Sequence, residues 1–357
     1  MVYLIAFLVL LGVLIFVHEA GHFLIAKLVG VKVLKFSLGF PPAMIKRKWG
    51  ETEYILSWVP LGGYVKLLGE DPESGDQVPP EEKPRAFTSK PLWARMAVIA
   101  AGPISNYLLA VVLLCVGFTV GLPVLTSSIG KVLDGSPAME AGIKEGDQIV
   151  EINGSRVWRW EDMRRIIERS ADEQLRVTVE RDGKEIALTV TPKLAEEKSV
   201  LGEDVGRIGV APSGKTVHVG FPASLYEGAR FSVELTRMIG ATLVNLVTGK
   251  LSAKALSGPI MIAQASGETL KAGLLHYVVL MAFISINLAI INLLPVPILD
   301  GGHLLFFAIE AVIRRPVTGR VREIAVQLGL LFIVFLMCLV FYNDISRIIT
   351  KGWSLTP

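Results

Sequence analysis

The sequence has little charge, few aromatic residues and few cysteines for its length. Only 19% of its 357 residues are Asp, Glu, Lys or Arg, and only 8% are aromatic, which argues against an ordinary soluble enzyme. Its two cysteines, Cys115 and Cys338, both lie inside apolar runs. We therefore expect neither a disulfide framework nor a thiolate metal site, and interpret both as buried apolar side chains. The basic residues adjoin apolar runs without interleaved aromatic residues, which argues against nucleic acid as a partner.

Long apolar runs are what the sequence has instead. Hydrophobic residues make up 52% of the chain, and the mean hydropathy is +0.53. About 20 apolar residues in a helix cross roughly 30 Å of hydrocarbon, and four runs reach that length: 2–28, 96–122, 274–294 and 324–341. The first run has no basic segment before it and no small-residue cleavage site after it, so we expect it to be retained rather than removed as a signal peptide.

The segments between these runs differ in character. Residues 31–70 alternate polar and apolar side chains between Gly and Pro, which predicts short strands and hairpins. Residues 126–191 have the composition of a soluble domain, with short strands and one helix at 161–169. Residues 221–251 predict an amphipathic helix lying along the membrane surface.

The predicted fold is an α-helical integral membrane protein with about four transmembrane helices, a membrane-associated β-hairpin region and one inserted β-rich domain. We divide the chain into an N-terminal membrane half, the inserted domain, an extracytoplasmic linker with the surface helix, and a C-terminal membrane half. Their bounds are 1–123, 124–193, 194–273 and 274–357.

The first apolar run carries a motif that is unexpected in a membrane span. His18-Glu19-Ala20-Gly21-His22 matches H-E-x-x-H, in which two histidines four residues apart share one helical face and can bind one Zn²⁺. Glu19 is close enough to act as a general base on water. Ionisable residues near the centre of a span are costly unless they pair or bind a metal, so a metal site is favoured over chance.

Two histidines leave zinc short of a ligand, since a hydrolytic site usually has three protein ligands and a water. Asp300 and His303 follow Pro295 and Pro297 in a stretch that breaks its helix at membrane depth, where irregular backbone has to line a cavity. Asp300 is our candidate for the third ligand. His303 is the competing ligand, and a carboxylate that merely caps the following helix is the non-metal alternative.

Four motifs together resemble the site-2 protease family of intramembrane zinc metalloproteases, most closely its bacterial branch that regulates sigma-E. They are HEAGH, "PLGGYVKLLGE", "IAAGPISN" and "INLLPVPILDGGH", and they extend over nearly the whole chain. The resemblance implies zinc on His18, His22 and Asp300, with Glu19 as the catalytic glutamate. It also implies that Asn292 contacts the substrate backbone.

The same resemblance implies a β-hairpin that dips into the membrane and pairs with an unwound substrate strand, including Gly62, Gly63 and Tyr64. The implied substrates are single-span membrane proteins, of the anti-sigma-factor or remnant-signal-peptide type. The implied location is a bacterial inner membrane. Lys and Arg concentrate in segments 27–95 and 314–322, which the positive-inside rule places in the cytoplasm, leaving the inserted domain outside.

The inserted domain resembles a PDZ domain on the stretch "SPAMEAGIKEGDQIVEINGSRV". We expect a peptide or a C-terminus to add as a strand between residues 129–133 and the 161–169 helix. Many relatives carry two such domains in tandem, whereas the space here holds one, and a simple spacer is the alternative interpretation.

Two other functions stay open from the sequence. A divalent-metal carrier would also need the His18, His22 and Asp300 ligands, but it requires neither Glu19 nor a PDZ domain. A non-catalytic membrane PDZ scaffold would need no H-E-x-x-H motif.

Overall fold

The computed structural model describes residues 1–70, 78–195, 204–253, 256–315 and 319–351. These residues fall into two compact units. Unit 1 comprises Met1–Leu114, Phe231–Thr236 and Ser252–Pro357, and unit 2 comprises Cys115–Arg230 and Arg237–Leu251. Residues 196–203 of the predicted extracytoplasmic linker lie outside the described residues.

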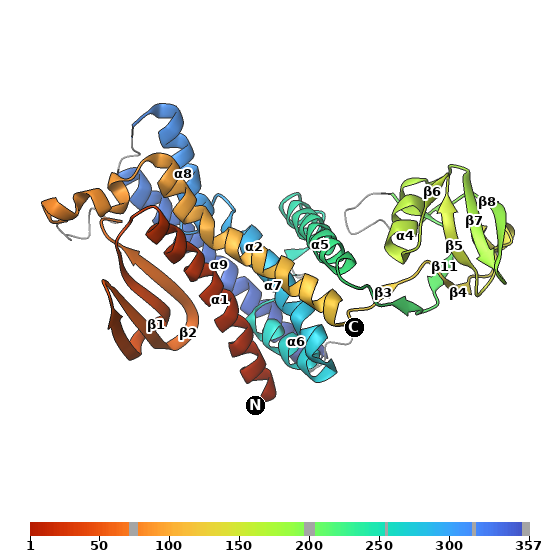
Figure 1. Cartoon of the computed structure of the whole chain (residues 1–357), viewed down its shortest axis with the longest axis horizontal. Coiled ribbons are helices and arrows are strands. Elements are labelled where there is room, and N and C mark those ends of the chain that lie inside the picture. The colour runs from red at the N-terminus through yellow and green to blue at the C-terminus, as the bar shows by residue number, and fades with distance from the viewer. Residues whose placement is uncertain (71–77, 196–203, 254–255, 316–318, 352–357) are drawn as a thin grey trace. The chain divides into compact units, whose positions relative to one another are not determined.

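Four helices of the described residues are long and apolar enough to cross a membrane, which confirms the number predicted. They are α1 (Val2–Leu28), α2 (Leu92–Val120), α7 (Leu274–Asn292) and α9 (Gly319–Lys351) (Figure 1). The shortest, α7, has 19 residues, and at 1.5 Å per residue its length of about 28 Å is close to the hydrocarbon thickness. The chain is therefore a multi-pass membrane protein.

The two cysteines differ from the prediction in one respect. Neither forms a disulfide, but Cys338 on α9 is exposed and Cys115 on α2 is only partly buried. A thiol is apolar enough to face hydrocarbon, so an apolar run does not by itself imply burial within the protein.

The other helices of unit 1 are shorter. They are α6 (Pro259–Ala272), α8 (Asp300–Ile313) and the 3₁₀ helices η1 (Pro80–Arg85) and η2 (Phe87–Ser89). Helix α6 packs on α1 and α7, although its stretch was predicted to be linker. Its first turn is capped by the buried carboxylate of Asp344 on α9, which accepts hydrogen bonds from the backbone N–H of Gly258 (2.9 Å), Ile260 (3.0 Å) and Met261 (3.1 Å).

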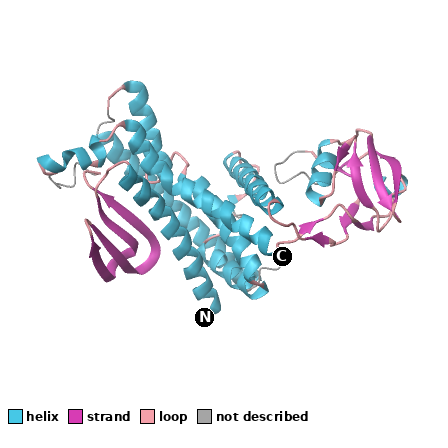
Figure 2. Cartoon of the chain, viewed as in Figure 1, coloured by secondary structure: helices cyan, strands magenta, loops and turns pink. Residues whose placement is uncertain are grey.

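Strands β1 (Val33–Trp49) and β2 (Thr52–Leu67) are antiparallel and much longer than the short strands expected. Figure 2 shows them as the strands of the otherwise helical unit 1. Residues 35–38 of β1 pair with β2 twice, with 53–56 on one side and with 63–66 on the other. In the described part of the chain, residues 63–67 pair only with β1, so this end of β2 forms an edge of the sheet.

The buried interior of unit 1 joins the first apolar helix to α7. Ala6, Leu10 and Leu14 line one face of α1 and pack on Tyr277 and Met281. The Tyr277 hydroxyl donates a 2.6 Å hydrogen bond to the Ala6 carbonyl, which satisfies its polar atom within the apolar contact. This packing fixes the rotation of α1 about its axis, and hence the direction in which its histidines point.

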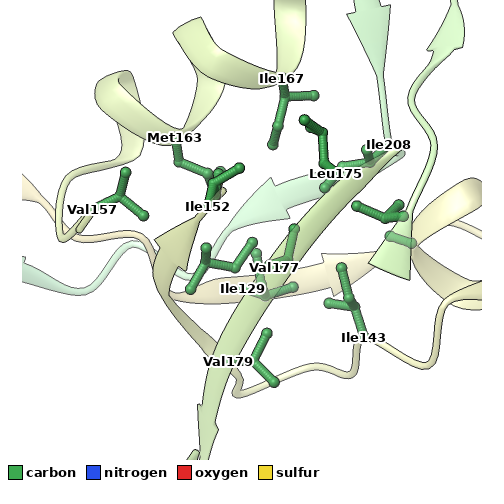
Figure 3. Close-up of a cluster of buried hydrophobic side chains, with 13 residues drawn as sticks. Ile129, Ile143, Ile152, Val157, Met163, Ile167, Leu175, Val177, Val179 and Ile208 are labelled. Carbon is green, nitrogen blue, oxygen red and sulfur yellow. The ribbon is translucent and has the colours of Figure 1, made fainter. Parts of the chain in front are cut away.

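Unit 2 holds the inserted β-rich region. Its elements are β3 (Val124–Leu125), β4 (Ile129–Val132), α3 (Pro137–Glu140), β5 (Gln148–Ile152), β6 (Ser155–Arg156), α4 (Trp160–Arg169), β7 (Leu175–Arg181), β8 (Lys184–Val190), β9 (Lys193–Leu194), β10 (Gly206–Arg207), β11 (Val210–Pro212), β12 (Thr216–Val217) and most of α5 (Ala223–Val247). The largest sheet has the order β6-β5-β7-β8 and is antiparallel. Figure 3 shows Met163 and Ile167 of α4 packed over Ile152, Leu175 and Val177 of this sheet.

The peptide edge predicted beside residues 129–133 is wrong. Strand β4 pairs with β11 on one side. On its other side, Ile129 donates to the Asp147 carbonyl (2.7 Å) and accepts from the Gly146 N–H (2.9 Å). An added strand needs unpaired N–H and C=O groups, and β4 has β11 on one side and residues 146–147 on the other side at Ile129. The sequence pattern could not show this, because β11 lies almost 80 residues further along the chain.

Asp147 is a structural carboxylate of unit 2. It is fully buried, and it accepts hydrogen bonds from Arg181 Nε and Nη2 (2.7 Å each) and from the Lys144 N–H (2.8 Å). Burial disfavours its charged form, but the hydrogen bonds from Arg181 and Lys144 outweigh burial and hold the pKa of Asp147 below its ordinary value.

We expect Asp147→Asn to lower the free energy of unfolding of unit 2 by about 2–4 kcal/mol, because it leaves the Arg181 guanidinium without its buried partner. A carboxylate with a lowered pKa stabilises the fold above about pH 4 and stops doing so as the pH falls through the folded-state pKa. Hydrogen–deuterium exchange of β5 and β7 at pH 7 and pH 3 measures both effects. The wild-type protein should lose protection on acidification and the variant should lose less; equal losses would contradict the assignment.

Candidate metal centre

Helix α1 presents His18 and His22 side by side. They are separated by four residues, so their rings stack one helical turn apart, edge to face, with centroids at 4.8 Å. Their Nε2 atoms are 3.2 Å apart. Both rings thus turn the same nitrogen toward one point.

Asp300 reaches that point from the start of α8. Its Oδ2 lies 3.2 Å from His18 Nε2, and its Oδ1 lies 3.6 Å from His22 Nε2. One ligand atom from each of the three residues lies within 4.8 Å of the others, and all three side chains are largely buried. Two imidazole nitrogens and one carboxylate oxygen are a donor set of catalytic zinc sites, which keep one position for water. The residues present therefore fit zinc.

The irregular segment between α7 and α8 positions Asp300. Gly301 and Gly302 are buried, and a Cβ at either residue would overlap carbonyl oxygens of residues 293–296. The two glycines therefore allow the first turn of α8 to fold back against this segment. The residue at the N-cap is Leu299, and the helix has no side-chain capping hydrogen bond. The carboxylate of Asp300 thus faces the histidines. It does not cap the helix, whereas the non-metal alternative required it to do so.

His303 lies one turn further along α8 and has a different partner. Its Nδ1 is 3.1 Å from Nη2 of Arg322 on α9. A guanidinium can only donate, so this ring nitrogen accepts a hydrogen bond. Among the described residues, His303 does not belong to the cluster of potential metal ligands.

Helix α2 covers the opposite side of the two histidines. His22 Nδ1 donates a 2.8 Å hydrogen bond to the Val98 carbonyl, which leaves Nε2 of that ring with its lone pair. One turn along α2, a Cβ at Gly102 would lie 2.6 Å from His22 Cε1 and 2.8 Å from His18 Cε1. One further turn along, the side chain of Asn106 lies 3.3 Å from His18 Nδ1. Residues at a spacing of four on α2 thus contact both rings.

The edge of the β1–β2 sheet comes up against Glu19. A Cβ at Gly63 would lie 2.8 Å from Glu19 Cγ and 2.8 Å from the Ser37 carbonyl oxygen, so only a glycine lets β2 approach α1 this closely. Gly62 packs against the Phe40 ring in the same way, and Tyr64 pairs with Ser37 in the sheet. The structure thus brings Gly63, the central residue of the predicted Gly62-Gly63-Tyr64 stretch, to the general-base candidate.

Asn292, the remaining predicted site residue, is the last residue of α7. It is half-buried and begins the segment that leads to Asp300. The contacts of the described residues do not place its side chain at the ligand cluster.

The chain is similar to known proteins over nearly its whole length. The model of the family described as "Peptidase family M50" matches residues 6–336. The chain belongs to peptidase family M50. Among its relatives is the "Regulator of sigma-W protease RasP" of Bacillus subtilis, which is 32% identical, with 96% of this chain and 98% of the relative covered. The "Zinc metalloprotease RasP" of Geobacillus kaustophilus is 34% identical with the same coverage. A protein of Agrobacterium fabrum with the name "Putative zinc metalloprotease" is 36% identical, with 97% and 96% covered.

Membership of this family decides between the functions left open by the sequence. This M50 peptidase is a zinc metalloprotease of the site-2 protease type. Family membership thus favours a protease over a divalent-metal carrier or a non-catalytic PDZ scaffold.

Sequence reasoning missed the contribution of α2 to this M50 peptidase. Val98, Gly102 and Asn106 had no assigned role, although two of them lie in the "IAAGPISN" motif that carried the resemblance. Their shared spacing of four residues was the available signal, since it places them on one face of a helix.

Gly102→Ala tests this contact in the M50 peptidase. The added methyl group would overlap both imidazole rings, so we expect the affinity for zinc to fall roughly tenfold or more, the scale of a lost outer partner of a metal ligand. Competition with a coloured chelator measures the affinity. Gly12→Ala on α1 is the matched control, because a Cβ there meets nothing within 4 Å. Equal zinc affinities for the two variants would show that α2 does not shape the site.

Proposed function

We propose that this chain is an intramembrane endopeptidase that cuts the transmembrane segments of single-span membrane proteins. In this proposal His18, His22 and Asp300 hold the zinc and Glu19 is the general base. The convergence of three ligand atoms at membrane depth, beside a sheet edge that contacts Glu19, carries the proposal. Buried ionisable groups are retained in a span when they perform a function.

Each residue then has a defined task. When bound, zinc supplies Lewis acidity, which polarises a peptide carbonyl and makes water a better proton donor. Glu19 accepts a proton from the attacking water and gives it to the amine of the departing peptide. His22 and Asp300 are held by the Val98 carbonyl and by the α7–α8 segment, so the ligands are oriented before substrate arrives.

The edge of β2 can bind the unwound substrate as an added strand. A transmembrane helix hides its carbonyls in hydrogen bonds from residue i+4, so it must unwind before it can be cut. Among the described residues, 63–65 pair with β1 along one side of β2, and an opened substrate strand can add along the other side. Asn292 is assigned to contact the same strand from the end of α7.

The substrate class follows from the same reasoning. Single-span proteins such as anti-sigma factors or remnant signal peptides present one helix that can be unwound at the sheet edge. The name of the Bacillus subtilis relative, a regulator of sigma-W protease, supports the anti-sigma-factor type for this chain. The host membrane in this proposal is a bacterial inner membrane, since the relatives named above come from bacteria.

We assign residues 124–193, together with strand β11 that pairs with β4, to a PDZ domain that binds a peptide or a C-terminus. Because β11 lies on one side of β4 and residues 146–147 pair with Ile129 on the other, we place the peptide beside β11 rather than beside 129–133. A Cβ at Gly206 would lie 2.7 Å from the Ile167 carbonyl of α4, so the chain that leads into β11 lies directly against α4. A peptide would add to the outer edge of β11.

Topology is tested by cysteine labelling. In a Cys115→Ala, Cys338→Ala background, Ser155→Cys on the exposed strand β6 should react with a membrane-impermeant maleimide from outside the cell. Arg315→Cys should react only after the membrane is opened. The reverse pattern would overturn the orientation given by the basic residues.

Cleavage is tested with purified components. The full-length protein and a tagged single-span substrate are placed together in liposomes, and the products are identified by mass spectrometry. We expect a zinc-dependent cut within the transmembrane segment. A cut confined to the aqueous tails of the substrate would contradict the proposal.

A further inference from the structure

Asn106 is a buried polar residue beside the first histidine of the motif. It lies on α2, it has no exposed surface, and its side-chain nitrogen is 3.3 Å from His18 Nδ1. The hydroxyl of Ser285 on α7 donates a 2.7 Å hydrogen bond to the Asn106 main-chain carbonyl. The main chain of this residue thus contacts α7, while its side chain is directed at the first histidine of the motif.

The side-chain oxygen of Asn106 indicates how the amide is oriented. Among the described residues, Oδ1 is buried and has no hydrogen-bond partner. The oxygen and the nitrogen of a side-chain amide are told apart by their hydrogen-bond partners. A half turn of the Asn106 amide exchanges these two atoms, and the contact with His18 is the one that changes. The half turn replaces that contact by an equivalent one, in which Oδ1 faces Nδ1.

The two orientations have opposite consequences for His18. If the amide nitrogen donates to Nδ1, the neutral ring keeps its hydrogen on Nε2, and Nε2 cannot bind a metal. If Oδ1 accepts from Nδ1–H, the lone pair of Nε2 is free. Nε2 is the atom that lies 3.2 Å from Asp300 Oδ2 and 3.2 Å from His22 Nε2.

His22 provides the comparison within the same site. Its Nδ1 faces the Val98 carbonyl, which can only accept a hydrogen bond, so the tautomer of that ring is already set. Among the residues that the structure describes, the partner of the corresponding His18 atom is the Asn106 side chain instead of a backbone carbonyl, two turns further along α2.

We propose that Asn106 is a positioning residue whose Oδ1 accepts the Nδ1–H of His18 and so directs Nε2 of that ring to the metal. This inference rests on the proposed ligand set. It gives Asn106 a role in metal binding without contact with the substrate.

Three variants of the full-length protein separate this role from simple packing. Asn106→Asp keeps the shape and can only accept, so zinc affinity should stay within about threefold of wild type. Asn106→Leu keeps the volume and cannot accept, so the affinity should fall by about 10- to 100-fold, as when an outer hydrogen-bonding partner of a metal ligand is removed. Ser285→Ala removes the hydrogen bond to the Asn106 main chain only and is the control with unchanged zinc affinity.

The readouts are zinc affinity by chelator competition, the visible absorption of the cobalt-substituted protein, and the thermal unfolding of the zinc-free protein. A loss of cobalt absorption in Asn106→Leu with an unchanged unfolding temperature supports positioning. Wild-type zinc affinity in Asn106→Leu would overturn the proposal. An equal loss in Asn106→Asp and Asn106→Leu would overturn it as well, even if the leucine variant unfolds early. His18→Ala distinguishes a failure of the proposed ligand set from a failure of the role of Asn106. If this variant binds zinc as the wild type does, His18 is not a ligand and the ligand set itself is wrong.

Discussion

Glu19→Gln should stop proteolysis while leaving zinc bound. Glutamine keeps the size and the hydrogen-bonding capacity of the side chain beside Gly63, but it cannot accept a proton from water. The three ligands are untouched, so zinc content should equal that of wild type. Loss of general-base catalysis should lower the cleavage rate by about 10²–10⁴-fold, and by more if the same carboxylate also protonates the leaving amine.

The experiment compares single-turnover cleavage of one tagged single-span substrate by wild-type and variant protein in liposomes. Glu323→Gln on α9 is a matched control, because it makes the same chemical change outside the candidate site. Near wild-type cleavage by Glu19→Gln with full zinc content would show that Glu19 is not the base.

Asp300→Ala should release the zinc. It removes the one carboxylate that faces both imidazoles, at 3.2 and 3.6 Å, and leaves two nitrogen ligands where a catalytic site needs three protein ligands. The loss in affinity should exceed the roughly 10–100-fold that removal of an outer partner costs. Elemental analysis after dialysis against a weak chelator should find zinc in wild type and almost none in the variant.

His303→Ala is the companion variant, because His303 is the competing ligand on the same helix. Its Nδ1 contacts Arg322, so we expect this variant to retain zinc. Zinc retained by Asp300→Ala and lost by His303→Ala would show that His303, and not Asp300, is the third ligand.

The parts of this site that follow local rules could be predicted from the sequence. His18 and His22 had to share a helical face, because their spacing of four matches one turn. Asp300 could be singled out because prolines and glycines break the helix at membrane depth, where irregular backbone lines a cavity. The number of long apolar helices followed from the length needed to cross hydrocarbon.

The parts that depend on contacts between distant segments could not be predicted. The N-cap residue of helix α6, Gly258, has no side chain that could cap it, and the cap comes from Asp344, which lies over 80 residues further along the chain. The second pairing of residues 35–38 turns a simple hairpin into a sheet with an edge at 63–67. Alternating polar and apolar residues indicate strands but not their neighbours. The pairing of β4 with β11 has the same cause.

Zinc-edge X-ray absorption of the purified full-length protein can identify the ligands of the proposed site, because it counts the atoms around the metal. We expect one zinc per chain with two imidazole nitrogens at about 2.0–2.1 Å and carboxylate or water oxygen at about 2.0–2.2 Å. We also expect the loss of one imidazole contribution, or of the metal, in His18→Ala and in His22→Ala. A spectrum with sulfur at about 2.3 Å, or one unchanged by either substitution, would contradict a site built from His18, His22 and Asp300.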